Sequence, residues 1–230
     1  MGHFCEKYLP IIFDNDGSRG TNQFFETDYN EATSILKREA ELEENSKLAL
    51  EVLHTSFMNI DKYLSKYSIY QLANGLEYIF NPSFGNIGFL FENRGLNQKK
   101  QIETLDALGD LMLYIHEEKA EPVLGHLDQK PKNKQNNILN YSCYMFWETA
   151  CIPHICDREG IDACLRVMAK CAQSHNVAVV EGALHGLGHA QSAYGYPIIQ
   201  EYIQKANFGN SSLSSALRRY AEAAKTGSIL

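Results

Sequence analysis

Apolar residues recur along this chain at intervals of three and four, which is the spacing of one face of an α-helix. The pattern begins near Glu31, with Ala32, Ile35 and Leu36, and it continues to Ile60. Further helices are predicted at 69–80, 99–118, 138–150, 161–174, 177–193, 198–206 and 213–225. Only a short glycine-containing segment near residue 88 is ambiguous with a strand. The sequence therefore predicts an all-α fold.

The interruptions of this pattern predict a single helical domain over residues 1–230. Residues 1–30 are mixed and aromatic, with a turn signal at Asp14-Asn-Asp-Gly-Ser18, so we expect an irregular N-terminal cap there. Asn81-Pro82 predicts the end of one helix. The segment 128–137 is polar and basic and has nothing to bury, so we expect it to form a loop.

A short internal repeat indicates how the helices are arranged. Residues 70–79 align with residues 178–187 at an offset of 108, and each segment follows a longer apolar helix after a short break. Both segments contain a small-small-Leu step, Asn74-Gly75-Leu76 in one and Gly182-Ala183-Leu184 in the other. Two such helix pairs predict stacked antiparallel hairpins, as in an α-α superhelix, where each pair buries its face on the next.

The later part of the chain resembles helical proteins of the HEAT or armadillo type found in bacteria. The resemblance lies in Leu165-Arg-Val-Met-Ala-Lys-Cys171, in Val180-Glu-Gly-Ala-Leu-His-Gly-Leu-Gly-His189 and in the aromatic stretch Tyr144-Met-Phe-Trp-Glu148. The repeats are less regular than in a HEAT array, because the glycine-rich stretch 85–95 interrupts them. The resemblance implies an α-α superhelix that binds proteins on a concave face, by analogy an immunity protein, and it implies no reaction.

The net charge indicates which partners the protein can bind, and the cysteine content indicates its compartment. The net charge of −7 and the pI near 5.6 argue against a general affinity for nucleic acids or anionic membranes, and they suit a basic protein partner. Lys130, Lys132 and Lys134 are expected to lie in a solvated loop. No run approaches the roughly 20 apolar residues of a membrane span. We expect a cytoplasmic protein whose six cysteines are reduced.

The segment Glu181-Gly-Ala-Leu-His-Gly-Leu-Gly-His189 carries the most distinctive chemistry. A helix would place Glu181, His185 and His189, at i, i+4 and i+8, in one polar stripe with small residues between them. Such a stripe is either a site or a tight helix packing seam with hydrogen-bonded imidazoles. Two imidazoles at i and i+4 can share zinc, but the segment lacks the Glu that follows the first His in the zincin motif. The packing seam is the simpler interpretation, and we predict no metal and no cofactor.

Two more motifs lie at the end of the predicted helix 138–150. Cys151, His154 and Cys156 would suit zinc if a fourth ligand came from elsewhere, but the proline between them indicates a turn, and buried thiols explain the motif better. The pair Trp147-Glu148 precedes that turn. A Trp beside an acid is either a binding hot spot or a core anchor of the helix pair.

Together these patterns predict a protein-binding module, an immunity or adaptor protein that occludes a basic partner, with no catalytic residue. Aromatic anchors would supply affinity and carboxylates would steer association. The predicted binding surface consists of Trp147, Glu148, Glu181, His185 and His189. One alternative is a metal-dependent enzyme in which His154 joins the stripe of Glu181, His185 and His189 as a further ligand. Another alternative is a structural subunit of an oligomer.

Overall fold

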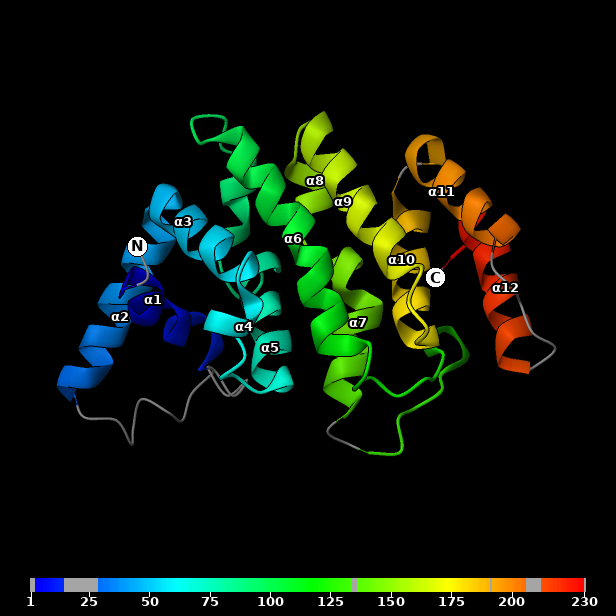
Figure 1. Cartoon of the computed structure of the whole chain (residues 1–230), viewed down its shortest axis with the longest axis horizontal. Helices are drawn as coiled ribbons and strands as arrows, with labels where there is room; N and C mark the ends of the chain where they lie inside the picture. Colours follow the sequence, from blue (N-terminus) through cyan, green and yellow to red (C-terminus); the bar gives the residue numbers. More distant parts are fainter. Residues whose placement is uncertain (1–2, 15–28, 134–135, 191, 206–211, 230) are drawn as a thin grey trace.

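The structure, a computed structural model, describes residues 3–14, 29–133, 136–190, 192–205 and 212–229, and all regular elements in these ranges are helices (Figure 1). The all-α class is therefore confirmed. Among the described helices, none has the length and apolar character of a membrane span. The elements are α1 (His3–Phe13), α2 (Tyr29–Glu44), α3 (Ser46–Phe57), α4 (Ile60–Tyr63), α5 (Ile69–Phe80), η2 (Ile87–Glu92), α6 (Gln98–His116), η3 (Gly125–Leu127), α7 (Asn136–Thr149), α8 (Ile152–Ile155), α9 (Arg158–Cys171), α10 (Val177–His189), α11 (Ser192–Lys205) and α12 (Ser212–Lys225).

Two rows of helices lie side by side across the molecule (Figure 1). One row is α3, α6, α9 and α11, the other is α5, α7, α10 and α12, and each helix contacts the next one in its row. Contacts also join the rows, between α5 and α6, α6 and α7, α9 and α10, and α11 and α12. Fully buried leucines such as Leu53, Leu72, Leu108 and Leu184 belong to one core that extends through both rows. Burial of such side chains is the main stabilising contribution to the fold.

Local sequence signals set the ends of the helices. Ser68 and Gln71 form a capping box at the start of α5, and Asn81 ends this helix before Pro82. The observed α5 therefore matches the predicted range 69–80. Asn or Asp side chains accept a backbone N–H at the starts of α3, α6, α9 and α10.

The N-terminal segment is more regular than the sequence suggested. The expectation of an irregular cap over residues 1–30 is wrong for α1, while residues 15–28 lie outside the described part of the chain. Pro10 and the aromatic composition favoured an irregular segment in the prediction, although the apolar residues of α1 recur at the intervals of three and four that define its buried face. This face includes Cys5, Tyr8, Leu9, Ile12 and Phe13.

Several connections also differ from the predictions. The glycine-rich stretch contains the 3₁₀ helix η2, not a strand. The expected loop 128–137 is helix-free up to residue 133, but α7 already begins at Asn136, and residues 134 and 135 lie outside the described ones. Further along, α10 ends at His189 and α11 begins at Ser192, so the break between the predicted helices 177–193 and 198–206 comes earlier than expected. All six cysteines are free.

The glycines of α10 allow α7 to approach closely. A Cβ atom added at Gly182 would lie 2.2 Å from the backbone carbonyl oxygen of Cys143, and one at Gly186 would lie 2.5 Å from the Trp147 ring. No side chain larger than hydrogen fits at either position without movement of α7. The small residues of the Glu181–His189 segment therefore form the packing seam that was one of the two interpretations of this segment.

We expect Gly182→Ala to lower the free energy of unfolding by about 1–3 kcal/mol, because the backbone of α7 would have to move away. The gain of about 1 kcal/mol that alanine brings to a helix interior offsets only part of the overpacking, because the clash is with a backbone carbonyl that cannot rotate away. Gly109→Ala in α6 is the matched control, since its Cβ would meet the flexible Lys170 side chain at 3.2 Å. Urea denaturation should show a loss for the first variant and none for the control. Equal stabilisation of both would contradict the close packing of α7 on α10.

Candidate functional site

The predicted surface residues gather where α7 and α10 meet, but most of them are buried. Trp147, Glu181 and His185 have exposed fractions of 2%, 1% and 0%. The side chains of Glu148 and His189 are 47% and 38% exposed. The prediction of a five-residue binding surface is therefore wrong for the first three residues, which the neighbouring helices cover, and only the other two reach solvent.

Trp147 is a core residue of the seam between α7 and α10. Its ring packs on Gly186, which leaves room for it, and edge-on against Phe146 with the ring centroids 5.0 Å apart. Its Nε1 has no hydrogen-bond partner among the described residues. The sequence left open whether this residue is a hot spot or a core anchor, and the structure identifies it as a core anchor.

Glu181 holds a loop in place and does not face a partner. One of its carboxylate oxygens accepts the Gly125 N–H at 2.6 Å, and the other accepts the His126 N–H at 3.0 Å and contacts Nδ1 of the same residue. These contacts satisfy a buried carboxylate and fix η3 against α10. The His126 ring in turn stacks on Tyr220 of α12, with the ring centroids 4.3 Å apart.

A hydrogen-bonded cluster surrounds the buried His185. Its Nδ1 lies 2.6 Å from the Tyr220 hydroxyl, and its Nε2 lies 3.1 Å from Oε2 of Glu148 and 3.2 Å from Nε2 of His189. The Tyr144 hydroxyl lies 3.4 Å from that of Tyr220. The cluster thus joins α7, α10 and α12. The ligand atoms of Glu148, His185 and His189 lie within 4.8 Å of one another, close enough to share a metal ion.

Burial determines the protonation states in this cluster. It lowers the pKa of His185, and the smaller raising effect of Glu148 does not reverse this shift, so the ring is neutral at physiological pH. Burial also raises the pKa of Tyr144 and of Tyr220, so both hydroxyls keep their protons. A neutral imidazole has one N–H and one lone pair. Because a carboxylate only accepts, Nε2–H of His185 donates to Glu148, and the Nδ1 lone pair accepts the Tyr220 hydroxyl proton.

Cys151, His154 and Cys156 do not form a ligand set. Among the described residues, they belong to neither of the two groups whose donor atoms converge. Burial raises the pKa of Cys151 to about 11, so its thiol stays protonated. His154 is exposed on α8, a short helix at the predicted turn. It is therefore not a further ligand beside His185 and His189, as the alternative of a metal-dependent enzyme required.

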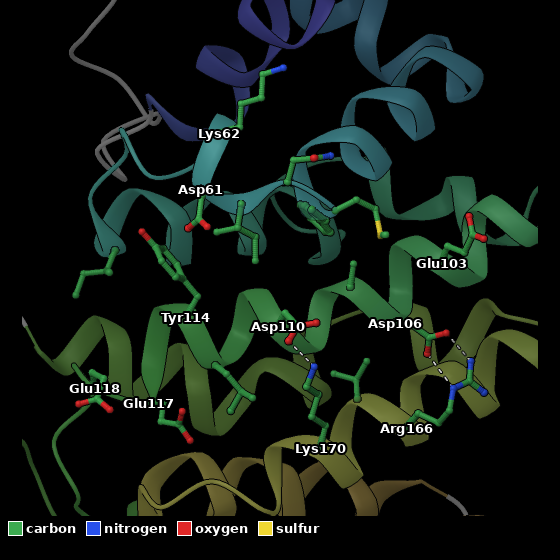
Figure 2. Close-up of a pocket in the computed structure, with 18 of the residues that line it drawn as sticks. Asp61, Lys62, Glu103, Asp106, Asp110, Tyr114, Glu117, Glu118, Arg166 and Lys170 are labelled. Atoms are coloured by element: carbon green, nitrogen blue, oxygen red, sulfur yellow. Dashed lines mark hydrogen bonds and ion pairs between the residues drawn. The ribbon is translucent and has the colours of Figure 1, made fainter. Parts of the chain in front are cut away.

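A groove runs along α6 in the first row of helices (Figure 2). It has a volume of about 1450 Å³ and lies between the segment 57–62, α6 and α9. The α6 side chains that line it recur every three or four residues, which places them on one face of the helix. Among these side chains are Glu103, Asp106, Asp110 and Tyr114, and Glu117 follows directly after the end of the helix.

The groove carries an excess of negative charge. Six carboxylates and four cationic side chains line it, which leaves an excess of two negative charges. In its middle, Arg166 donates two hydrogen bonds of 2.9 Å to Asp106, and Lys170 pairs with Asp110 (Figure 2). These pairs hold α9 beside α6 and neutralise the centre. The other charged residues of the lining are the acidic Asp61, Glu103, Glu117 and Glu118 and the basic Lys62 and Lys119.

Two exposed apolar side chains lie in the same groove. Met58 is 53% exposed and Tyr114 is 41% exposed, and Figure 2 shows Tyr114 pointing from α6 toward Asp61. Methionine adapts to irregular surfaces, and tyrosine is a frequent anchor of protein interfaces. Sequence reasoning missed this site. The signal was the acidic stripe in the segment 99–118, which recurs at helical spacing opposite the apolar face.

Comparisons of the chain with protein-family models, with curated proteins and with solved structures found no match. The resemblance to HEAT or armadillo proteins therefore stays a prediction.

Proposed function

We propose that the protein is a protein-binding module with the architecture of an α-α superhelix, and that it holds a basic segment of a partner protein in the groove along α6. The two rows of helices support this architecture, because consecutive helices of each row pack on one another as in solenoid proteins. The observation that carries the function is the groove lining, in which carboxylates accompany the exposed Met58 and Tyr114.

The groove offers the two kinds of contact that protein interfaces use. Met58 and Tyr114 would provide apolar area to bury, and a few anchors of this kind dominate binding energy. Glu103 at one end of the α6 stripe, and Glu117 and Glu118 at the other, would attract Lys and Arg side chains and accelerate association. Arg166 and Lys170 neutralise the centre. At the ends, Glu103 pairs with Lys99, and Glu118 pairs with His175, through side chains that are largely exposed to solvent. Such exposed pairs contribute little and can be exchanged for a partner's cation, so apolar contact is favoured in the centre and charged contact at the ends.

Binding of this kind fits an immunity or adaptor protein that covers the functional face of a basic partner. Such occlusion depends on shape and charge, and it requires no reacting group in the groove. A structural subunit of an oligomer would instead place the groove against another copy of this chain. The two roles therefore predict different contacts for Tyr114: a basic partner protein for an immunity or adaptor protein, and another copy of this chain for an oligomer subunit.

A photo-crosslinking amino acid in place of Tyr114 tests the proposal in lysate of the source organism. We expect one dominant basic protein to be cross-linked from this position. The matched control carries the same probe at Tyr141, which is 60% exposed on α7 and outside the groove, and should not capture this protein. Cross-links only between copies of this chain, or to an acidic protein, would overturn the proposal.

The captured partner then allows a quantitative test. We expect Tyr114→Ala to weaken its binding about 10–100-fold, as the loss of an interface anchor does. The double variant Glu103→Lys, Glu118→Lys should slow association, and more so at low salt. The double variant Glu44→Lys, Glu159→Lys makes the same charge change at exposed positions outside the groove lining and should leave the rate unchanged. Binding that is indifferent to Tyr114→Ala would contradict the groove as the docking site.

A further inference from the structure

We propose a second site at the junction of α7 and α10, where Glu148, His185 and His189 bind one divalent transition-metal ion of the zinc class. The site is independent of the proposed protein-binding function, because its ligands lie on the other row of helices. It also differs from the metal set considered from the sequence. There the carboxylate was Glu181, which in the structure binds the η3 backbone.

The distances between the three ligand atoms fit a small ion. Nε2 of His185 lies 3.2 Å from Nε2 of His189 and 3.1 Å from Oε2 of Glu148. The distance between Nε2 of His189 and Oε2 of Glu148 is 4.0 Å. Ligands about 2.0–2.1 Å from a tetrahedral zinc ion lie about 3.3 Å from one another. Two of the three distances are already close to this value, and the third closes with a small rotation of the half-exposed Glu148 side chain.

The surroundings orient His185 for coordination. Metal-bound histidines usually donate their other ring N–H to a neighbouring acceptor, which fixes the tautomer. The Tyr220 hydroxyl, 2.6 Å from Nδ1 of His185, is such an acceptor. Its own proton can then be donated to Tyr144, 3.4 Å away. Tyr220 is thus a positioning residue: an ion at Nε2 of His185 would replace the proton shared with Glu148, and Tyr220 would accept the Nδ1–H of the metal-bound ring.

The helix ends make the site favourable for a cation. Glu148 lies one residue before the end of α7, and His189 is the last residue of α10. The C-terminal end of a helix carries a partial negative charge, so two such ends and one carboxylate converge on this point.

The site is closed on one side and open on the other. His185 is fully buried, whereas Glu148 and His189 are partly exposed and give an ion access from solvent. Three protein ligands leave a fourth tetrahedral position, which water fills in open zinc sites. The other converging group, Glu117, Glu118 and His175, has two exposed members and no fully buried histidine, which makes it a suitable control.

The experiment uses the full chain without a histidine tag, stripped of metal by a chelator and titrated with Co²⁺. We expect one Co²⁺ per chain, with the visible absorption of a four-coordinate ion and displacement by Zn²⁺. Binding without defined stoichiometry, or an absorption spectrum of a six-coordinate ion, would overturn the proposal.

Variants assign the binding to these residues. His189→Ala and Glu148→Gln change partly exposed side chains and should leave the fold intact, and each should weaken Co²⁺ binding by more than about 100-fold, beyond the range seen for residues that only orient a ligand. Tyr220→Phe should weaken it about 10–100-fold. His175→Ala should leave it unchanged. Loss of binding in the His175 variant, or full binding in the His189 variant, would contradict the site.

Discussion

Replacing Trp147 by alanine is expected to lower the free energy of unfolding by about 3–5 kcal/mol. The side chain is 2% exposed, and its ring fills the space that Gly186 leaves between α7 and α10. Removing it would leave a large cavity in a close-packed seam that the helices cannot fully close. Urea denaturation followed by circular dichroism measures the effect, because the chain has only one Trp and its fluorescence is lost with the substitution.

Two controls show whether the loss comes from packing. Trp147→Phe keeps an aromatic ring and removes an N–H that has no hydrogen-bond partner among the described residues, so it should cost only about 1–2 kcal/mol. Phe84→Ala truncates an aromatic side chain that is 64% exposed and should change the free energy of unfolding by less than about 0.5 kcal/mol. If Trp147→Ala were as mild as Phe84→Ala, Trp147 would be a surface residue after all.

The helices were largely predictable from the sequence, because their signals are local. The range of α5 follows from a capping box at Ser68 and from Asn81-Pro82, which lie within a few residues of the helix ends. The segment that forms α1 also has apolar residues at intervals of three and four, but Pro10 and the many aromatic residues are more typical of an irregular segment. The helix forms there because its buried face packs on α5, and this contact is not visible in the local pattern.

The candidate sites were less predictable, because they depend on which faces other helices cover. Spacing placed Glu181, His185 and His189 on one side of a helix, but it did not show that η3 and α12 lie over that side. The partner of the histidines is Glu148, which comes from a different helix and is 37 residues away from His185 in the chain. The acidic stripe of α6 was visible in the sequence, whereas its groove exists only because α4 and α9 lie on either side.

Removing the Glu181 carboxylate, as in Glu181→Ala, is expected to lower the free energy of unfolding by about 3 kcal/mol. The carboxylate is 1% exposed and accepts the backbone N–H groups of Gly125 and His126. Without it, two N–H donors in a partly buried loop lose a charged acceptor, and His126 loses the contact that orients its ring over Tyr220. Denaturation measures the loss, and hydrogen exchange should show faster exchange of the Gly125 and His126 amides.

Glu148→Ala is the matched control for this variant. It removes a carboxylate from the neighbouring helix that is 47% exposed, and the hydrogen bond that this carboxylate accepts from neutral His185 contributes about 1 kcal/mol. Both variants are measured in the presence of a chelator, so that metal binding does not contribute. Equal losses of stability in the two variants, or unchanged exchange of the Gly125 and His126 amides, would contradict the role of Glu181 in holding η3. A large effect confined to Glu181 would show that this carboxylate holds η3 against α10. Of the segment Glu181–His189, only His185 and His189 would then remain as candidates for binding an ion.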